Sequence, residues 1–495
     1  MASAVAAPAR GMTSLRTKLF YGLGSVAFGV KDNGFQTILL PFYNLVLHVP
    51  AHLVGLAIFI ALAFDALIDP VVGHISDNFR SRWGRRHPFM YAAALPVAIS
   101  YLLLWNPPHW SSGALFIYLI VVAVVVRTFI TFYEIPSSAL VPELTSDYDE
   151  RTSFIGYRVF LGWYGALVML TLAYLVFMGA GAAGGGGCGR MGQLHAEGYS
   201  LYGITAAVVM FSAIVVSALG THRFIPYFRK PERIFHSLRG YAKAMLQSLS
   251  NRAFLILLAA AIFFQLANGL VFSLTFYINT FFWKLSNQQI GIVNLALFVS
   301  LILAFAMALP LSKRLGKKAA AIAMFAIGFV INSTPLMLAL LGVIVPHPGP
   351  ALVAFLFCFT TIGSGFAIGS SIMIVSMVAD IVEDNEIKTG NRSEGLFFAG
   401  NSFIQKASSG LGLFASGIML TAVGFPTDTT PCSVDPHIVL RFSWTYIVTI
   451  AAIYGLGFLI ISRFPITRAS HEENLRTLAR EVGEGLIDEP PAPMI

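Results

Sequence analysis

Two aspartates, Asp65 and Asp69, lie four residues apart inside an apolar stretch that is long enough to cross a membrane. On a helix this spacing places both carboxylates on one face, about one turn apart. Burying a carboxylate in hydrocarbon is costly, and two carboxylates on one face also repel each other. A bound cation relieves both costs, and hard cations prefer oxygen ligands. The pair therefore predicts a cation site, which the rest of the chain must position.

Further charged and polar side chains fall within apolar stretches, where an ionisable group indicates a functional site by default. Arg127, Thr131 and Glu134 are spaced four and three residues apart, so they share one face of a predicted helix. The others are Lys31, Asp32, Gln36, Arg158, Gln265, Asn268, Asn401 and Lys406. Each charge alone could belong to a structural ion pair. Nearly all of these charged residues precede residue 227, and Lys406 is the exception. We therefore expect the first half of the chain to hold a cation and the second half to hold a polar group or ligand beside it.

The composition indicates that membrane helices carry these residues. The chain has 495 residues, of which 56% are hydrophobic and only 11% charged, and its mean hydropathy is +0.74. Soluble domains carry about 25% charged residues, and a helix needs roughly 20 apolar residues to cross a bilayer. We therefore expect an all-α membrane protein. The net charge of +8 does not suggest nucleic acid, because the basic residues gather in a few short loops.

Apolar runs predict twelve membrane helices in two groups of six. The first group spans residues 18–47, 53–77, 88–106, 113–145, 152–178 and 200–226, and the second spans 252–283, 287–312, 318–345, 350–384, 391–424 and 437–463. Two groups of six are typical of secondary transporters. The expected parts are an N-terminal half with the cation site (1–226), a cytoplasmic connecting segment (227–251), a C-terminal half (252–464) and a cytoplasmic tail (465–495).

The loops predict how the chain is oriented. Basic residues gather at 80–86, 229–233 and 313–318 and in the tail, whereas the loops at 48–52 and 345–350 are almost free of Lys and Arg. Because cytoplasmic loops carry the excess of Lys and Arg, both termini are predicted to be cytoplasmic. We expect a multi-pass protein of the cell (inner) membrane that works as a monomer.

A basic loop follows the second predicted helix. The run from Gly73 to Arg86 has the Gly…Asp…Arg…Gly-Arg-Arg form of the loop signature of the major facilitator superfamily, and 310–318 is a weaker copy after the eighth helix. Topology alone would also explain these basic residues. We expect a cytoplasmic gate made of Asp77, Arg82, Arg85 and Arg86, with acidic partners such as Asp147, Asp149 or Glu150.

Five motifs together resemble one transporter family. They are Lys31-Asp32, Asp65-x-x-x-Asp69-Pro70, Thr131-x-x-Glu134-Ile-Pro136, Glu150-Arg-Thr-x-x-x-x-Tyr157-Arg158 and Gln405-Lys406. Over residues 18–464 the chain resembles the glycoside-pentoside-hexuronide:cation symporters of the major facilitator superfamily, of which melibiose permease is a member. The resemblance implies the major facilitator fold, with two six-helix halves. It also implies symport of a glycoside or related sugar derivative with Na⁺ or H⁺, by alternating access and without a cofactor.

The resemblance implies roles for individual residues. The cation ligands would be Asp65, Asp69, Thr131 and Glu134, with Na⁺ held at the three carboxylates. Asp32 and Arg158 would bind sugar hydroxyls, and Lys406 would bridge the cation and substrate sites. Gln36, Gln265, Asn268 and Asn401 would line the substrate site with further polar groups.

The chain also departs from this pattern. Ser137 and Ser138 stand where the permease has two aromatic residues, which argues against melibiose itself. Leu62 stands where the permease has an arginine one turn before the first aspartate of helix 2, and Arg127 is expected to compensate from helix 4. Glu134 replaces an aspartate, which leaves the choice between Na⁺ and H⁺ open.

Two other interpretations remain. The run from Pro136 to Leu140 resembles the sodium-dependent lysophosphatidylcholine symporters, which implies an amphiphile as substrate and a disulfide between Cys188 and Cys432. Two free thiols are the alternative for these cysteines. The other interpretation is a membrane enzyme or sensor. It is disfavoured because the sequence has no His/Cys metal spacing, phosphate loop or nucleophile motif. The expected partners are a small-molecule substrate, the coupling cation and the bilayer.

Overall fold

The computed structural model of the protein describes residues 12–145, 147–179, 191–228, 252–389 and 394–465, and all regular structure within these ranges is helical. The first rod is built end to end from α1 (Leu15–Leu23), α2 (Ser25–Asn33), η1 (Gly34–Ile38), α3 (Leu39–Pro41) and η2 (Phe42–Val46). The next rods are α4 (Ala51–Asn78), α5 (His87–Trp105), α6 (Ser112–Ser138), α8 (Tyr148–Leu172) with η3 (Ala173–Phe177), and α9 (Ala196–His222). Short helices α7 (Val141–Leu144), η4 (Gly192–Leu194) and η5 (Ile225–Tyr227) lie between or after them.

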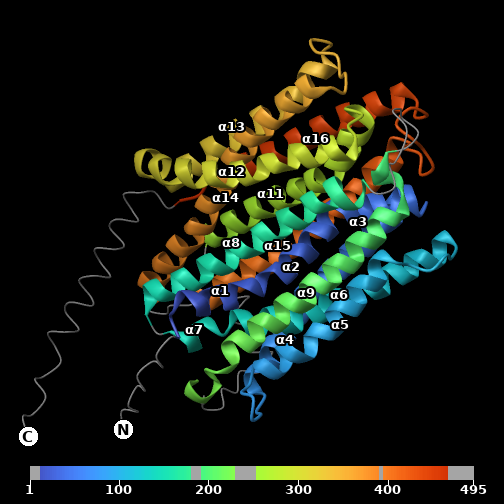
Figure 1. The fold of residues 1–495 in the computed structure, drawn as a ribbon. Helices are drawn as coiled ribbons and strands as arrows, with labels where there is room; N and C mark the ends of the chain where they lie inside the picture. Colours follow the sequence, from blue (N-terminus) through green and yellow to red (C-terminus); the bar gives the residue numbers. More distant parts are fainter. Residues whose placement is uncertain (1–11, 146, 180–190, 229–251, 390–393, 466–495) are drawn as a thin grey trace, which may run out of the picture.

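The later rods are α11 (Arg252–Tyr277) with η6 (Ile278–Phe282), α12 (Asn287–Leu315), α13 (Lys317–Leu340), α14 (Pro350–Thr389), α15 (Glu394–Ala422) and α16 (Pro436–Ile461). Among the described residues, ten helices are long and apolar enough to cross a membrane; the first rod and α15 run beside them. Figure 1 shows the rods aligned along one direction, with α12, α13 and α16 on one side and α4, α5 and α6 on the other. The predicted all-α fold is confirmed, and each predicted helix overlaps one rod.

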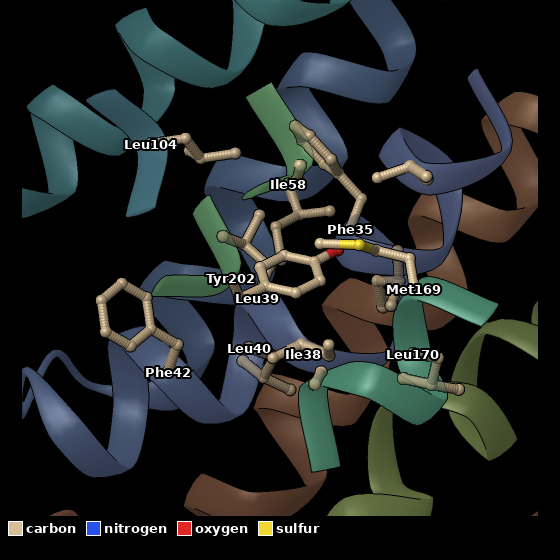
Figure 2. Close-up of a cluster of buried hydrophobic side chains, with 14 of the residues drawn as sticks. Phe35, Ile38, Leu39, Leu40, Phe42, Ile58, Leu104, Met169, Leu170 and Tyr202 are labelled. Carbon is tan, nitrogen blue, oxygen red and sulfur yellow. The ribbon is translucent and has the colours of Figure 1, made fainter. Parts of the chain in front are cut away.

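The first rod is not a continuous α-helix. Two of its segments, η1 and η2, are π-helical, a conformation that is rare in proteins overall but occurs often at functional sites. The η1 segment follows directly after Lys31, Asp32 and Asn33, so the wide turn lies next to the charges. Its apolar residues pack in a buried cluster that includes Phe35 and Ile38, which Figure 2 shows among neighbouring helices.

Close packing of α4 against α15 aligns the two elements that carry the main charges. A Cβ added at Gly417 would lie 2.2 Å from the carbonyl oxygen of Ala51, and one at Gly55 would lie 2.9 Å from that of Leu413. Phe59 and Phe414 stack farther along, with ring centroids 6.1 Å apart. Only glycine allows the backbones to approach this closely, as is common between membrane helices.

Replacing Gly417 with alanine is therefore expected to force α15 away from α4. Overpacking of this kind costs about 1–3 kcal/mol, so the midpoint of thermal unfolding in detergent should fall by several degrees. The matched control is Gly455→Ala in α16, because nothing lies within 4 Å of a Cβ at that position. Equal midpoints for both variants would contradict the close approach.

The two ends of the bundle differ in what joins the halves. We call the end with the loops around residues 48, 284 and 427 the His48 end, and the end with the loop 79–86 the Arg85 end. At the His48 end, the buried Tyr277 hydroxyl donates to Asn44 Oδ1 at 2.7 Å, and Asn287 Nδ2 donates to the Tyr174 carbonyl at 2.9 Å. These bonds join early and late rods, so the halves meet there.

The buried apolar clusters also differ in whether they join the two halves. One buried cluster contains residues of both halves, such as Tyr43 and Phe442. A second cluster draws its members only from residues 253–464. At the Arg85 end, the ion pairs between described residues, including Lys18–Glu150 at 2.8 Å and Lys317–Asp380 at 2.5 Å, each join elements of one half. Among the described residues, the contacts between the two halves are therefore closer at the His48 end.

Candidate cation and substrate site

Asp65 lies at the centre of the buried charges. Its side chain is fully buried in α4 and accepts hydrogen bonds from Arg127 Nη1 at 3.0 Å and from the Thr131 hydroxyl at 2.8 Å. Both donors come from α6, so this helix holds Asp65 through two side chains on one face. Arg127 thus forms an ion pair with Asp65 from α6, and its compensation for the arginine missing at Leu62 stays a prediction.

Asp69 lies one turn farther along α4 and joins the two halves. Its Oδ1 lies 3.2 Å from the Thr131 hydroxyl, whose single hydrogen makes the shorter bond to Asp65. Its Oδ2 accepts from Lys406 Nζ at 2.5 Å. The same ammonium lies 3.3 Å from Asp65 Oδ2. Lys406 belongs to α15, so one cation of the late half bridges both aspartates of the early half.

Lys31 and Asp32 extend the cluster into the first rod. Lys31 Nζ is buried and lies 2.9 Å from Asp32 Oδ1 and 3.8 Å from Glu134 Oε2. Asp32 Oδ1 also lies 3.4 Å from Arg127 Nη2, although this side chain remains 40% exposed. Asp32 therefore faces both the buried charges and open space.

The structure brings Asp65, Asp69 and Thr131 together but surrounds them with cations from the protein itself. Lys406 lies against Asp65 and Asp69, and Lys31 is the cation nearest to Glu134. In the described part of the chain, no group of three His, Cys, Asp or Glu side chains is arranged to hold a metal ion. Asp65 and Asp69 therefore already have cationic partners within the protein. An entering cation must compete with lysines.

Two prolines loosen the backbone beside these charges. Pro70 lies inside α4 next to Asp69, and Pro136 lies inside α6 near Glu134. A proline has no N–H, so the carbonyl four residues earlier loses its helical donor. The freed carbonyls belong to Ala66 and Phe132. Such oxygens are suitable ligands for a hard cation.

A cavity of about 250 Å³ opens beside the charged cluster. Its walls carry five of the predicted substrate residues, namely Asp32, Gln36, Gln265, Asn268 and Lys406. Its other lining residues are Leu62, Arg127, Phe272, Ser402, Gln405 and Ser409. Lined mainly by amides, hydroxyls and charges, the cavity suits a polar ligand with several hydrogen-bonding groups.

Two predicted substrate residues are not among the residues that line this cavity. Arg158 donates to the Tyr21 hydroxyl at 3.2 Å and to Ser137 Oγ at 3.1 Å, and its guanidinium lies over the Phe28 ring. Asn401 is buried in α15. Their predicted contact with substrate stays a prediction.

No substrate role was predicted for Ser402, Gln405 or Ser409. They share the face of Lys406 on α15, and this helical spacing could have identified them. Leu62 and Phe272 gave no such signal, because apolar residues in membrane helices usually face lipid or neighbouring helices.

Two of the predicted gate residues, Arg85 and Arg86, have a different acidic partner from the expected ones. Arg85 Nη2 and Arg86 Nε lie 2.5 and 2.7 Å from the same oxygen of Glu143, in the short helix α7. Arg86 also lies 3.4 Å from Asp77. Burial lowers the pKa of the Arg86 guanidinium, and the carboxylate of Glu143 opposes this shift. Arg82 is exposed beside the Trp83 ring and joins none of these pairs.

The expected partners of the gate have other contacts. Asp147 caps the start of α8 by accepting from the Glu150 backbone at 2.8 Å, and Glu150 itself pairs with Lys18. Nothing is described of the Asp149 side chain. Glu143 was overlooked because it stands in an apolar run, although a carboxylate there needs a partner.

The cysteines agree in part with the disulfide prediction. Cys432, at the His48 end, is disulfide-bonded, and Cys358 is free. Cys188 lies outside the described residues, as do most of the connecting segment and nearly all of the tail. The pairing of Cys188 with Cys432 stays a prediction.

Comparison with known proteins places the chain in a transporter family. The chain belongs to the family described as MFS/sugar transport protein, whose model matches residues 20–468. It is 28% identical to an uncharacterized symporter of Synechocystis over 92% of this chain and 95% of the relative. It is 24% identical to an isoprimeverose transporter of Lactiplantibacillus pentosus over 84% and 82% of the two chains.

A relative with another kind of substrate matches over a similar length. The chain is 21% identical to the sodium-dependent lysophosphatidylcholine symporter 1 of Xenopus tropicalis, over 94% of this chain and 90% of the relative. Among solved structures, a D-xylose-proton symporter matches with a TM-score of 0.61 at 14% identity, over 91% and 98% of the two chains. This likeness confirms the major facilitator fold. The protein is a multi-pass membrane transporter of this superfamily.

Proposed function

We propose that the protein is a cation-coupled symporter of a glycoside or related sugar derivative that works by alternating access. The observation that carries this proposal is the bridge from Lys406 to Asp65 and Asp69, because it joins the two halves beside a polar cavity. The relative named an isoprimeverose transporter supports a sugar derivative as substrate. The protein would act as a monomer in the cell membrane, with both termini in the cytoplasm.

The mechanism follows from competition for the aspartates. A cation that takes the oxygens of Asp65, Asp69 and Thr131 must displace the Lys406 ammonium. The released ammonium then faces the cavity, where a substrate can engage it together with the amides of Gln265 and Asn268. Cation and substrate sites thus share one side chain, so occupancy of one changes the affinity of the other.

Uptake into proteoliposomes tests this function directly. Two labelled pools, one of small glycosides and hexuronides and one of lysophospholipid, are offered with and without an inward Na⁺ gradient at two pH values. Gradient-driven uptake of a sugar derivative is the expected result, and it would also identify the ion. Uptake of lysophospholipid alone would favour the second candidate, which the similarity to the lysophosphatidylcholine symporter supports.

Contacts at the His48 end predict how one variant shifts the conformational equilibrium. Tyr277→Phe removes the buried hydrogen bond to Asn44, which is worth about 1 kcal/mol. We expect opening of the His48 end to become several-fold more frequent. A cysteine placed at Phe281, which is buried there, should then react faster with a membrane-impermeant thiol reagent in a Cys358→Ser background. An unchanged labelling rate would contradict this prediction.

A further inference from the structure

One aromatic ring lies among the polar walls of the cavity. Of the eleven described residues that line the cavity, Phe272 on α11 is the only aromatic one. It is 36% exposed, and among the described residues its ring contacts no other aromatic ring and no cationic group. A ring that lines the cavity without such a partner can receive a ligand on its face.

The other rings beside the charged cluster already have partners. The Arg127 guanidinium lies over the Phe35 ring, 4.6 Å from its centroid, and the Arg158 guanidinium lies over the Phe28 ring at 4.9 Å. Neither Phe28 nor Phe35 lines the cavity. Among the described residues, Phe272 is therefore the ring that a ligand in this cavity can meet.

The helix that carries Phe272 also supplies amides on the same face. Gln265, Asn268 and Phe272 are spaced three and four residues apart on α11, and all three line the cavity. The Asn268 amide donates to Gln265 Oε1 at 3.3 Å, and its oxygen accepts from the Tyr454 hydroxyl at 3.1 Å. The Nε2 group of Gln265 donates to no described residue, so its hydrogens are free for hydroxyl oxygens of a ligand.

A sugar ring has a surface that matches this helix face. Its C–H groups form an apolar face, and its hydroxyl groups lie around the edge. The face of an aromatic ring is negative and attracts the slightly positive hydrogens of C–H groups. An alkyl side chain such as that of Leu62, the other apolar residue of the cavity wall, offers apolar contact without this attraction.

We propose that the sugar ring of the substrate stacks on Phe272, and that this residue sets the affinity for the sugar derivative. The inference rests on the proposed function and adds a specificity-determining residue to it. Hydroxyl groups at the edge of the stacked ring then bind the amides of Gln265 and Asn268. An acyl chain would use Phe272 only as apolar surface, so an alkyl replacement of the ring distinguishes a sugar from a lipid.

The test measures gradient-driven uptake of isoprimeverose and of methyl β-D-galactopyranoside by proteoliposomes that contain the full chain. Neither probe carries an aromatic group of its own. Phe272→Leu keeps the apolar surface and loses the aromatic face, so the KM for the transported sugar should rise roughly threefold to tenfold. The stabilisation of the protein by Na⁺ or H⁺ against thermal unfolding should stay unchanged. Phe272→Trp keeps an aromatic face and should keep a KM no higher than that of the unmodified protein.

Phe272→Trp also gives a signal that does not depend on transport. Addition of the transported sugar should shift the tryptophan fluorescence of this variant, relative to the unmodified protein with its six tryptophans. The matched control is Phe305 on α12, which is 61% exposed and does not line the cavity. Phe305→Leu should leave the KM unchanged, and Phe305→Trp should show no fluorescence shift.

The outcomes separate this inference from the function on which it rests. An unchanged KM in Phe272→Leu would leave the symporter function standing and overturn the stacking role. An equal rise in KM in Phe305→Leu would also overturn it, because the effect would not arise in the cavity. Uptake of lysophosphatidylcholine without uptake of either sugar would overturn both proposals.

Discussion

Replacing Asp65 with asparagine is expected to abolish cation-driven uptake and to destabilise the protein. The variant removes the hydrogen-bonded carboxylate of Arg127, a side chain that is 1% exposed and keeps only the longer contact to Asp32, and one partner of Lys406. Breaking a buried ion pair on one side costs about 3–5 kcal/mol, because the other charge is left uncompensated. The readouts are gradient-driven uptake in proteoliposomes and the midpoint of thermal unfolding.

A second substitution separates coupling from stability in this experiment. Asp65→Asn combined with Arg127→Gln removes one charge of each sign, so the midpoint should recover in part while coupled uptake stays lost. The matched control is Asp428→Asn, because Asp428 is exposed near the His48 end. If cation dependence is unchanged in the single Asp65→Asn variant, Asp65 does not hold the coupling cation.

Replacing Lys406 with glutamine is expected to tighten cation binding and to uncouple it from substrate. The variant removes the ammonium that competes for Asp65 and Asp69, so their oxygens are open to an entering cation. We expect at least a tenfold gain in cation affinity, which corresponds to about 1.4 kcal/mol. The measurement is the dependence of the unfolding midpoint on Na⁺ concentration and on pH.

A second lysine-to-glutamine variant is the matched control for Lys406→Gln. Lys284→Gln removes an exposed lysine at the His48 end and should leave the cation dependence of the midpoint unchanged. Weaker cation binding in the Lys406→Gln variant would mean that Lys406 organises the cation site rather than competing for it.

The twelve rods could be predicted from the sequence because apolar runs of membrane length leave few alternatives to helices. The bounds were less certain: α13 ends at Leu340, before the predicted 345, and α14 continues to Thr389, beyond the predicted 384. The π-helical segments were not predicted. Their residues mix apolar and polar side chains, as the adjoining α-helices do, so no local pattern distinguishes them.

The sequence predicted which residues form the candidate site, but not which of them contact each other. The i, i+4 spacing of Asp65 and Asp69 and the face shared by Arg127 and Thr131 identified residues that the structure brings into contact. The contact between Lys406 and Asp69 spans 337 positions of the sequence, and no local pattern specifies such a distance. Glu143 was missed as the partner of Arg85 and Arg86 because it stands in an apolar run, before the acidic residues at 147–150.

The wide turns at the His48 end have a consequence for how the rods can bend. The π-helical segments η2, η3 and η6 each lie where a rod reaches that end. A π-turn holds one more residue than an α-turn. If that extra residue left the turn, the side chains that follow would rotate about the helix axis by about 100°. These segments can therefore act as hinges. A shift between π and α geometry would change the helical register of the rod there, while the ion pairs of the charged cluster remain intact. Their backbone amides are expected to exchange hydrogen faster than those of α4, and equal protection would argue for rigid rods.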